Sequence, residues 1–449
     1  MDALELIKNI KSGNIDVVEN THKAIEQVKK INNKYNYMNN ISEELALKQA
    51  KEVKKNPKGR LAGLPITVKD CLCVKDVETT AGSAILKGYK PVFNATAVQN
   101  AINEGAIILG KTSQDEFGFG SFNVNVGNGF KIPLNPVDET RVTGGSSGGS
   151  AGITRKVDFP HVSIAESTGG SIAAPASFCG VYGFTPTYGI VSRYGMIDYA
   201  SSLDKIGIIA KSVKETKLMF EVIAGRDEKD STSLQLPKIT KPKKLKYAII
   251  KEAFESAPEL KNELIAWLDK EKIKYDTISL PLTTKYANAA YYILAMAEAS
   301  TNLAKYCGLR YGHEEQLTES YNDYFTKVRT NSLGKEAKRR IILGTFTRMA
   351  GYRDAYYMKA LKTRTLIITE YKNAFKKYNL LISPTMPMVA PKIDEANKLS
   401  PLKAYQMDTL TVGPNLAGFP HLNIPAAEHK GLPIGLMMTV DHFNDSLLL

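Results

Sequence analysis

Short apolar segments alternate with longer helical patterns, and this alternation most limits the folds open to the chain. Extended segments are predicted at 64–68, 106–109, 247–250, 380–383, 421–424 and 434–440. Helical segments are predicted at 259–270, at 287–306 and, with breaks, at 337–378. Strands that alternate with helices bury their apolar faces in layers, so we predict an α/β fold with helices on both faces of a sheet.

The start of the chain is predicted to differ from the rest, since residues 1–56 show only helical periodicity. The apolar residues at helical spacing there are Leu4, Ile7, Ile10, Ala24, Ile25 and Val28. A length of 449 residues would by itself suggest two or three domains. The one linker-like stretch lies around 226–245, and no internal repeat is found.

Two Gly/Ser-rich segments, GGSSGGS at 144–150 and STGGSI at 167–172, follow the tripeptide Val68-Lys69-Asp70. Together they supply one lysine and several serines, the parts of an amide-cleaving site that needs no histidine. A serine hydroxyl needs a base to take its proton, and a lysine can do this only when neutral. Burial disfavours the ammonium form, so we expect the lysine to be buried.

The glycines of the second segment let the backbone approach closely and aim successive N–H groups at one point. Thr168, Gly169, Gly170 and Ser171 could therefore bind the oxyanion of a tetrahedral intermediate. Three other interpretations compete. Either segment could be a flexible turn. Residues 145–149 match G-x-S-x-G around Ser147, but a polar, proline-containing loop precedes them where a nucleophile elbow needs a strand. No Gly-Lys-Ser/Thr follows, which disfavours a phosphate loop.

The order of these motifs resembles the amidase signature family: Lys69, then GGSSGGSAG, then TGGSI with Pro175-Ala-Ser-Phe-Cys-Gly180. Within it, the chain most resembles the A subunits of glutamyl-tRNA(Gln) amidotransferases. That narrower similarity lies at 110–117, 192–195, 200–204, 339–341, 351–357, Asp408 and 415–420. The resemblance implies the amidase signature fold, a mixed central sheet flanked by helices, as a single domain over 1–449.

By the resemblance, Lys69 is the base, Ser146 the bridging serine and Ser171 the nucleophile. The family holds the bridging serine after a cis peptide bond, here Gly145–Ser146. Ser167 and Ala173 depart from the family pattern, which has Asp and Arg at these positions. The Asp and the Arg of the family pattern carry opposite charges, so replacing both by uncharged residues leaves no buried charge without a partner.

The resemblance also places Arg340, Asp408 and Tyr291 in a pocket for free glutamine. A guanidinium can bind the carboxylate of glutamine with two hydrogen bonds, and an aspartate can accept from its ammonium. Without the resemblance, Arg340 would be interpreted as part of a solvated helix face and Tyr291 as core.

The net charge of +13 would attract phosphate, for instance at 241–246 and 335–340. No aromatic platform or nucleic-acid module accompanies these clusters, so we attribute the charge to a lysine-rich composition. Four unevenly spaced cysteines predict thiols rather than disulfides or a metal site. The N-terminus has no apolar signal core and no run is long enough to span a membrane, so we expect a cytoplasmic protein.

The function hypothesis is a glutaminase subunit that releases ammonia from glutamine. By the resemblance, B and C subunits are its partners, and ATP and Mg²⁺ act in the B subunit, which also makes most contact with Glu-tRNA(Gln). No cofactor or metal is expected in this chain. Two alternatives stay open: a free-standing amidase acting on small acylamides, and an idle scaffold subunit.

Overall fold

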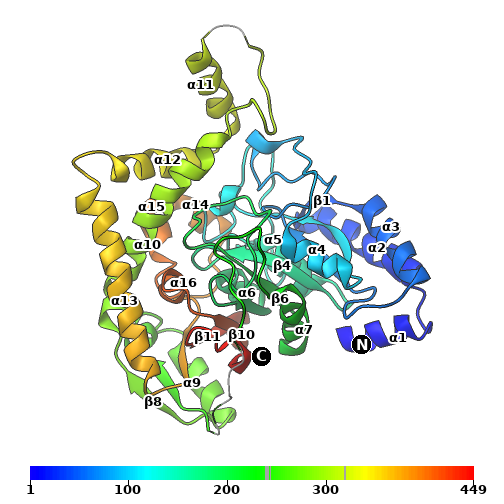
Figure 1. Cartoon of the computed structure of the whole chain (residues 1–449). Helices are drawn as coiled ribbons and strands as arrows, with labels where there is room; N and C mark the ends of the chain where they lie inside the picture. The colour runs from blue at the N-terminus through cyan, green and yellow to red at the C-terminus, as the bar shows by residue number, and fades with distance from the viewer. Residues whose placement is uncertain (238–241, 243, 318–319) are drawn as a thin grey trace.

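A single mixed sheet organises the molecule. A computed structural model describes residues 1–237, 242, 244–317 and 320–449, and Figure 1 shows their arrangement. Within these residues, eleven strands follow the order β1-β3-β2-β4-β6-β5-β10-β11-β9-β7-β8. Pairing is parallel in β3-β2-β4 and in β9-β7-β8 and antiparallel between the other neighbours. The strands are β1 Met38–Ile41, β2 Pro65–Lys69, β3 Ile107–Thr112, β4 Val162–Ser167, β5 Tyr182–Thr185, β6 Lys205–Ala210, β7 Tyr247–Ile250, β8 Tyr275–Ile278, β9 Leu380–Pro384, β10 His421–His429 and β11 Leu432–Val440.

Helices surround this sheet. In Figure 1, α10, α12 and α13 lie on one side of the molecule and α1 to α3 on the other. No helix in the described part of the chain is both long and apolar enough to cross a bilayer. The α-helices are α1 Ala3–Lys11, α2 Val17–Tyr35, α3 Glu43–Lys55, α4 Thr96–Asn103, α5 Gly148–Lys156, α6 Ala173–Cys179, α7 Val213–Ile223, α8 Lys251–Glu255, α9 Lys261–Lys270, α10 Pro281–Asn302, α11 Tyr321–Ser332, α12 Lys335–Arg348, α13 Lys359–Phe375, α14 Ile393–Lys398, α15 Pro401–Gln406 and α16 Val412–Leu416.

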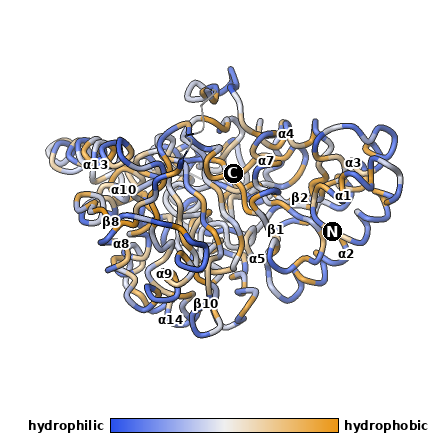
Figure 2. Tube along the Cα trace, turned by 90° about the horizontal axis from the view of Figure 1, so that it is seen from below, coloured by the Kyte–Doolittle hydropathy of each residue, from blue (hydrophilic) through white to orange (hydrophobic). Residues whose placement is uncertain are grey.

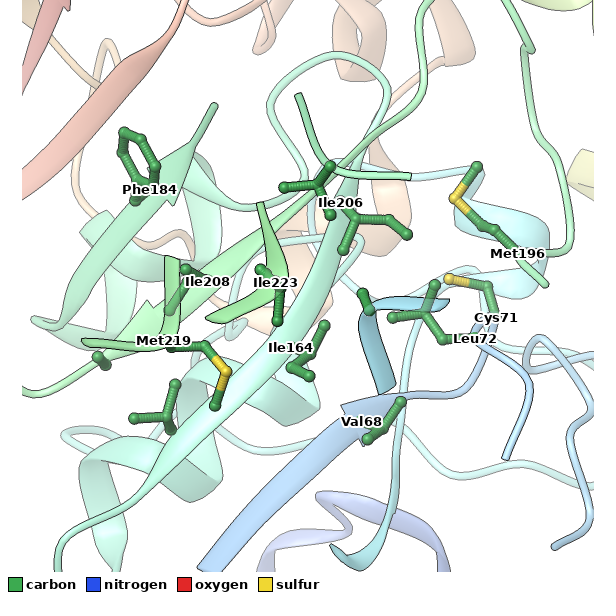
Figure 3. Packing of buried hydrophobic residues seen from close by; sticks show 14 of the residues in the cluster. Val68, Cys71, Leu72, Ile164, Phe184, Met196, Ile206, Ile208, Met219 and Ile223 are labelled. Carbon is green, nitrogen blue, oxygen red and sulfur yellow. The ribbon is translucent and has the colours of Figure 1, made fainter. Parts of the chain in front are cut away.

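Neighbouring residues of the central strands show that helices cover both faces of the sheet. Ala165 and Ile209 belong to a core cluster formed with α5 and α6. The residues one position earlier, Ile164 and Ile208, pack instead with Met219 of α7, as Figure 3 shows. Successive side chains of a strand point to opposite faces, so α5 and α6 lie on one face and α7 on the other. The predicted α/β fold with a mixed sheet is therefore confirmed.

The N-terminal helices form where the sequence supplies both caps and an apolar stripe. Asp16 caps α2 by accepting hydrogen bonds from the N–H groups of Val18 and Glu19, at 2.8 and 3.1 Å. The helix ends at Asn36, whose φ of 58° is left-handed. Along α2 and α13 in Figure 2, hydrophobic and hydrophilic residues alternate, as in helices with one buried face.

The structure differs from expectation at β1, inside the segment predicted to be helical. This four-residue strand buries only Met38 and pairs antiparallel with β3 at the sheet edge. Its stability comes from backbone pairing with a distant segment, which periodicity cannot reveal. The linker-like stretch falls partly outside the described residues, at 238–241 and 243, as does part of the basic cluster at 241–246. The single-domain organisation stays a prediction.

Candidate active site

The sheet brings Lys69 and the second Gly/Ser-rich segment to one edge. Lys69 is the last residue of β2, and the segment begins at Ser167, the last residue of β4. The two strands are parallel neighbours, with Val68 opposite Ile164. Because the carboxyl ends of adjacent parallel strands meet at the same edge, the lysine and the glycine-rich loop face a common space.

Lys69 is fully buried, as expected, and its amine contacts Ser146. The Lys69 Nζ lies 2.7 Å from Ser146 Oγ, 3.0 Å from the carbonyl oxygen of Glu166 and 2.8 Å from Glu166 Oε2. The expectation that burial alone neutralises this lysine is incomplete, because Glu166 is a buried carboxylate partner. The one sequence signal for Glu166 is its place as an acidic residue directly before the second Gly/Ser-rich segment.

Ser146 is held by the loop that precedes α5. The Gly145–Ser146 peptide bond is cis, as the resemblance implies. A side chain on Gly145 would overlap the carboxylate of Asp115, so this approach requires glycine. The N–H of Ser147 donates to the carbonyl oxygen of Ser171 at 3.2 Å, which joins the two Gly/Ser-rich segments. The Ser147 hydroxyl donates to a backbone carbonyl rather than to a histidine, which disfavours the nucleophile-elbow interpretation.

The loop that carries Ser171 has backbone donors available. Among the hydrogen bonds between described residues, none uses the N–H of Gly169, Gly170 or Ser171. A Cβ on Gly169 would lie 2.8 Å from the Tyr291 hydroxyl, and one on Gly170 would overlap Thr411. Close packing therefore requires both glycines, and it brings Tyr291 against the loop. The geometry is compatible with the expected oxyanion site.

The side chain of Thr168 joins two buried carboxyl groups. Its Oγ1 lies 2.7 Å from Glu166 Oε1 and 2.7 Å from Asp204 Oδ1. The other oxygen of Asp204 accepts the N–H groups of Tyr199 and Ala200, each at 2.9 Å. Burial raises the pKa of Asp204 well above its usual value, and the nearby charge of Glu166 raises it further. Neither carboxylate was predicted from the sequence, because Asp204 meets Thr168 only through the pairing of β4 with β6, and Glu166 meets Lys69 only through the pairing of β2 with β4.

Arg340 lies on α12 in a buried aromatic surrounding. Its Nε donates to Glu336 Oε1 at 2.8 Å, one helical turn earlier, and its Nη1 donates to the Tyr199 hydroxyl at 2.5 Å. The guanidinium carbon lies 5.1 to 5.6 Å from four ring centroids, those of Phe119, Tyr199, Tyr292 and Tyr405. Such contacts stabilise a desolvated cation. Arg340 is therefore not on a solvated helix face.

Asp408 belongs to the same pocket. It is buried and accepts a hydrogen bond from the Tyr292 hydroxyl at 2.5 Å. Burial raises its pKa, against the opposing effects of Tyr292, Ser121 and the charge of Arg340. Tyr291 is also buried, and burial raises its pKa well above the usual value; the charge of Asp408 nearby raises this pKa further and that of Arg340 opposes the rise. The structure thus brings together the three residues predicted to bind glutamine.

A cavity beside α12 reaches Arg340, whereas Asp408, Tyr291 and Ser171 are not among the described residues that line it. This cavity of about 240 Å³ is lined by Ser121, Asn125, Arg339, Arg340 and Tyr405, among others. Arg340 is thus reachable by a small molecule that enters between the loop at 120–125 and the helices α12 and α15. The size and position of the cavity suit a small ligand with a carboxylate.

The two departures from the family pattern are both fully buried small residues. Ser167 ends β4, and Ala173 is the first residue of α6. The Ser167 hydroxyl has no hydrogen-bond partner among the described residues. Neither position carries a charge, so the replacement leaves no buried ion without a partner.

Comparison with known proteins shows the family to which the chain belongs. The family model described as Amidase matches residues 19–449. The chain is 45% identical over 414 residues to the A subunit of the glutamyl-tRNA(Gln) amidotransferase of Archaeoglobus fulgidus, covering 91% of this chain and 89% of that protein. It is 42% identical to the protein of the same name from Thermoanaerobacter pseudethanolicus, covering 99% and 93%.

A solved structure is similar over the whole chain. The crystal structure of the glutamyl-tRNA(Gln) amidotransferase A subunit from Thermotoga maritima has a TM-score of 0.78 and 31% identity, covering 100% of this chain and 92% of that one. The chain therefore belongs to the amidase family, and the predicted resemblance is confirmed. Its similar relatives are A subunits of an amidotransferase.

Proposed function

We propose that this chain is the glutamine-hydrolysing subunit of a glutamyl-tRNA(Gln) amidotransferase. The observation that carries the proposal is the 2.7 Å hydrogen bond between the buried Lys69 amine and the Ser146 hydroxyl, at the sheet edge that also holds the Ser171 loop. The names of the relatives support glutamine as the amide. Arg340 and Asp408 offer the opposite charges that the carboxylate and ammonium of free glutamine require.

In the proposed reaction, Ser171 Oγ attacks the side-chain carbonyl carbon of glutamine. Its proton passes through Ser146 toward Lys69, and the N–H groups of Gly169 and Gly170 donate to the oxyanion. Collapse of the tetrahedral intermediate breaks the C–N bond, and the nitrogen takes up the proton and leaves as ammonia. Water then attacks the glutamyl ester on Ser171 and releases glutamate.

The proposal includes partners. B and C subunits would assemble with this chain, and the B subunit would use the ammonia to convert Glu-tRNA(Gln) to Gln-tRNA(Gln). ATP and Mg²⁺ would act there, and no step of glutamine hydrolysis in this chain uses them. The tRNA would make most of its contacts with that partner. We also propose a cytoplasmic location, where aminoacyl-tRNA is used.

The test is ammonia release from glutamine by the complex of this chain with its B and C partners. Ser171→Ala should lower the rate by roughly 10³-fold or more, because the nucleophile is lost. Wild-type activity should rise when Glu-tRNA(Gln) and ATP are added. Partner-independent cleavage of simple amides would indicate the free-standing amidase instead. An intact complex with no ammonia release would indicate the scaffold.

A further inference from the structure

We propose that Glu166 completes the base of this site by accepting, through Lys69, the proton that leaves Ser171. The inference rests on the proposed glutamine hydrolysis and concerns how the proton is held. Glu166 acts through Lys69 and is a positioning residue rather than a catalytic one. It lies on β4, directly beside the strand that carries the lysine.

The contacts of Lys69 show why a second acceptor is needed. An ammonium has three N–H donors and no lone pair. Lys69 Nζ has three acceptors within 3.0 Å, namely Ser146 Oγ and both the carbonyl and the carboxylate of Glu166. These three acceptors match the three donors of an ammonium, and one of them is a carboxylate, so Lys69 and Glu166 form a buried ion pair. In that state Lys69 can take a proton from Ser146 only if it passes one to Glu166.

Thr168 and Asp204 keep the carboxylate of Glu166 ready for that proton. The Thr168 oxygen lies 2.7 Å from both carboxyl groups, but its single hydroxyl proton can be donated to only one of them. The other contact is therefore a hydrogen bond that a protonated carboxyl group donates to the Thr168 oxygen. Burial favours neutral Asp204, since it raises the pKa of this group well above its usual value. Asp204 then donates to Thr168, and Thr168 donates to Glu166. Glu166 holds the single negative charge, opposite the single positive charge of Lys69.

The proton movements balance. The Ser171 O–H bond breaks as its oxygen bonds to the amide carbon, and the proton moves to Ser146. Ser146 passes its own proton to Lys69 Nζ, and Lys69 passes one to Glu166 Oε2. When the C–N bond breaks, the same steps run in reverse and a proton reaches the leaving nitrogen. The cluster gains one positive charge as the tetrahedral intermediate gains one negative charge, so the site as a whole stays neutral and need not release a proton to water.

Other titratable groups surround the cluster and bear on any pH dependence. Cys71 lies just after β2, close to the charges of Lys69 and Glu166. Burial raises the pKa of its thiol well above the usual value. Asp115 faces the cluster from the loop after β3, and burial raises its pKa to about 6. The remaining titratable neighbours are the buried ion pair of Lys111 with Asp70 and the side chains of Asp198 and Tyr199. The pH profile must therefore also be measured in an Asp115→Asn background.

The experiment measures kcat/KM for glutamine against pH in the assembled complex. Glu166→Gln keeps the size and one oxygen acceptor but cannot take the proton. We expect activity at pH 7 to fall about 10²- to 10³-fold. The acid limb of the profile should move to higher pH, because the lysine must now lose a proton to water. Glu166→Asp, which keeps a carboxylate, should recover part of the activity, and Glu215→Gln, at another buried glutamate on α7, should change neither.

The opposite result would overturn the inference. If Lys69 acts alone as a neutral base, the carboxylate only opposes its deprotonation. Glu166→Gln would then raise activity and move the acid limb to lower pH, and an unchanged profile would likewise refute the proposal. Thr168→Val gives an independent test if Glu166→Gln does not fold, since losing the hydroxyl should also move the limb to higher pH. Activity that survives Ser171→Ala would instead refute the proposed function.

Discussion

Replacing Arg340 with lysine tests whether the aromatic pocket selects the carboxylate of glutamine. Two of the three guanidinium nitrogens are already engaged, Nε by Glu336 and Nη1 by Tyr199. No hydrogen bond between described residues uses Nη2. This nitrogen lies on a buried side chain that lines the 240 Å³ cavity, so a ligand carboxylate that enters can reach it.

The expected loss follows from one charged hydrogen bond. Lysine keeps a positive charge near Glu336. It lacks the planar guanidinium group, whose nitrogens can donate hydrogen bonds to Glu336, Tyr199 and a ligand at the same time. A hydrogen bond to a charged group contributes about 1.5–3 kcal/mol. At roughly 1.4 kcal/mol for each factor of ten, KM for glutamine should rise about 10- to 150-fold. The value of kcat should change much less, because the carboxylate is bound equally in the ground and transition states.

The assay compares glutamine with a simple amide such as butyramide, which has neither carboxylate nor ammonium. Arg340→Lys should weaken only the reaction with glutamine. An equal loss with both amides would refute the reasoning, because it would show that the substitution disturbs the Ser171 loop or the fold. Thermal unfolding of the variant separates these cases. Tyr199→Phe, which removes only the hydroxyl that Arg340 contacts, is the matched control and should have a smaller effect on KM.

Two further predictions concern stability. Gly170→Ala would place a Cβ against the side chain of Thr411, so the free energy of unfolding measured in urea should fall by about 1–3 kcal/mol. Thr411→Gly in the same chain should recover part of this loss. An unchanged urea midpoint for Gly170→Ala would contradict the packing. His161 is fully buried and burial lowers its pKa to about 3, below the ordinary value of 6.5. At this residue the unfolded chain therefore binds more protons than the folded one as pH falls from about 6.5 to 3, and His161 should contribute a loss of stability of about 1.4 kcal/mol per pH unit in that window. His161→Gln should reduce the slope by this amount, whereas His22→Gln, at an exposed position, should leave it unchanged. Identical slopes in both variants would refute the assignment.

Elements with a strong local pattern were predictable from sequence. The strands predicted at 247–250, 380–383 and 434–440 correspond to β7, β9 and β11 within two residues at either end. The central strands β4 and β6 were not predicted. Both are six-residue segments that are buried throughout, so they lack the polar alternation that marks a strand with one exposed face.

The sequence by itself determined the fold class, the family, and the lysine and serines that the proposed reaction needs. It could do so because strand and helix periods are local and because three motifs occur in one order. Only the tertiary structure decided the partners of these groups. Glu166 meets Lys69 because β2 and β4 pair in parallel, and Asp204 meets Thr168 because β4 pairs with β6. Contacts between segments far apart in the chain depend on strand register and burial, and no local spacing encodes them.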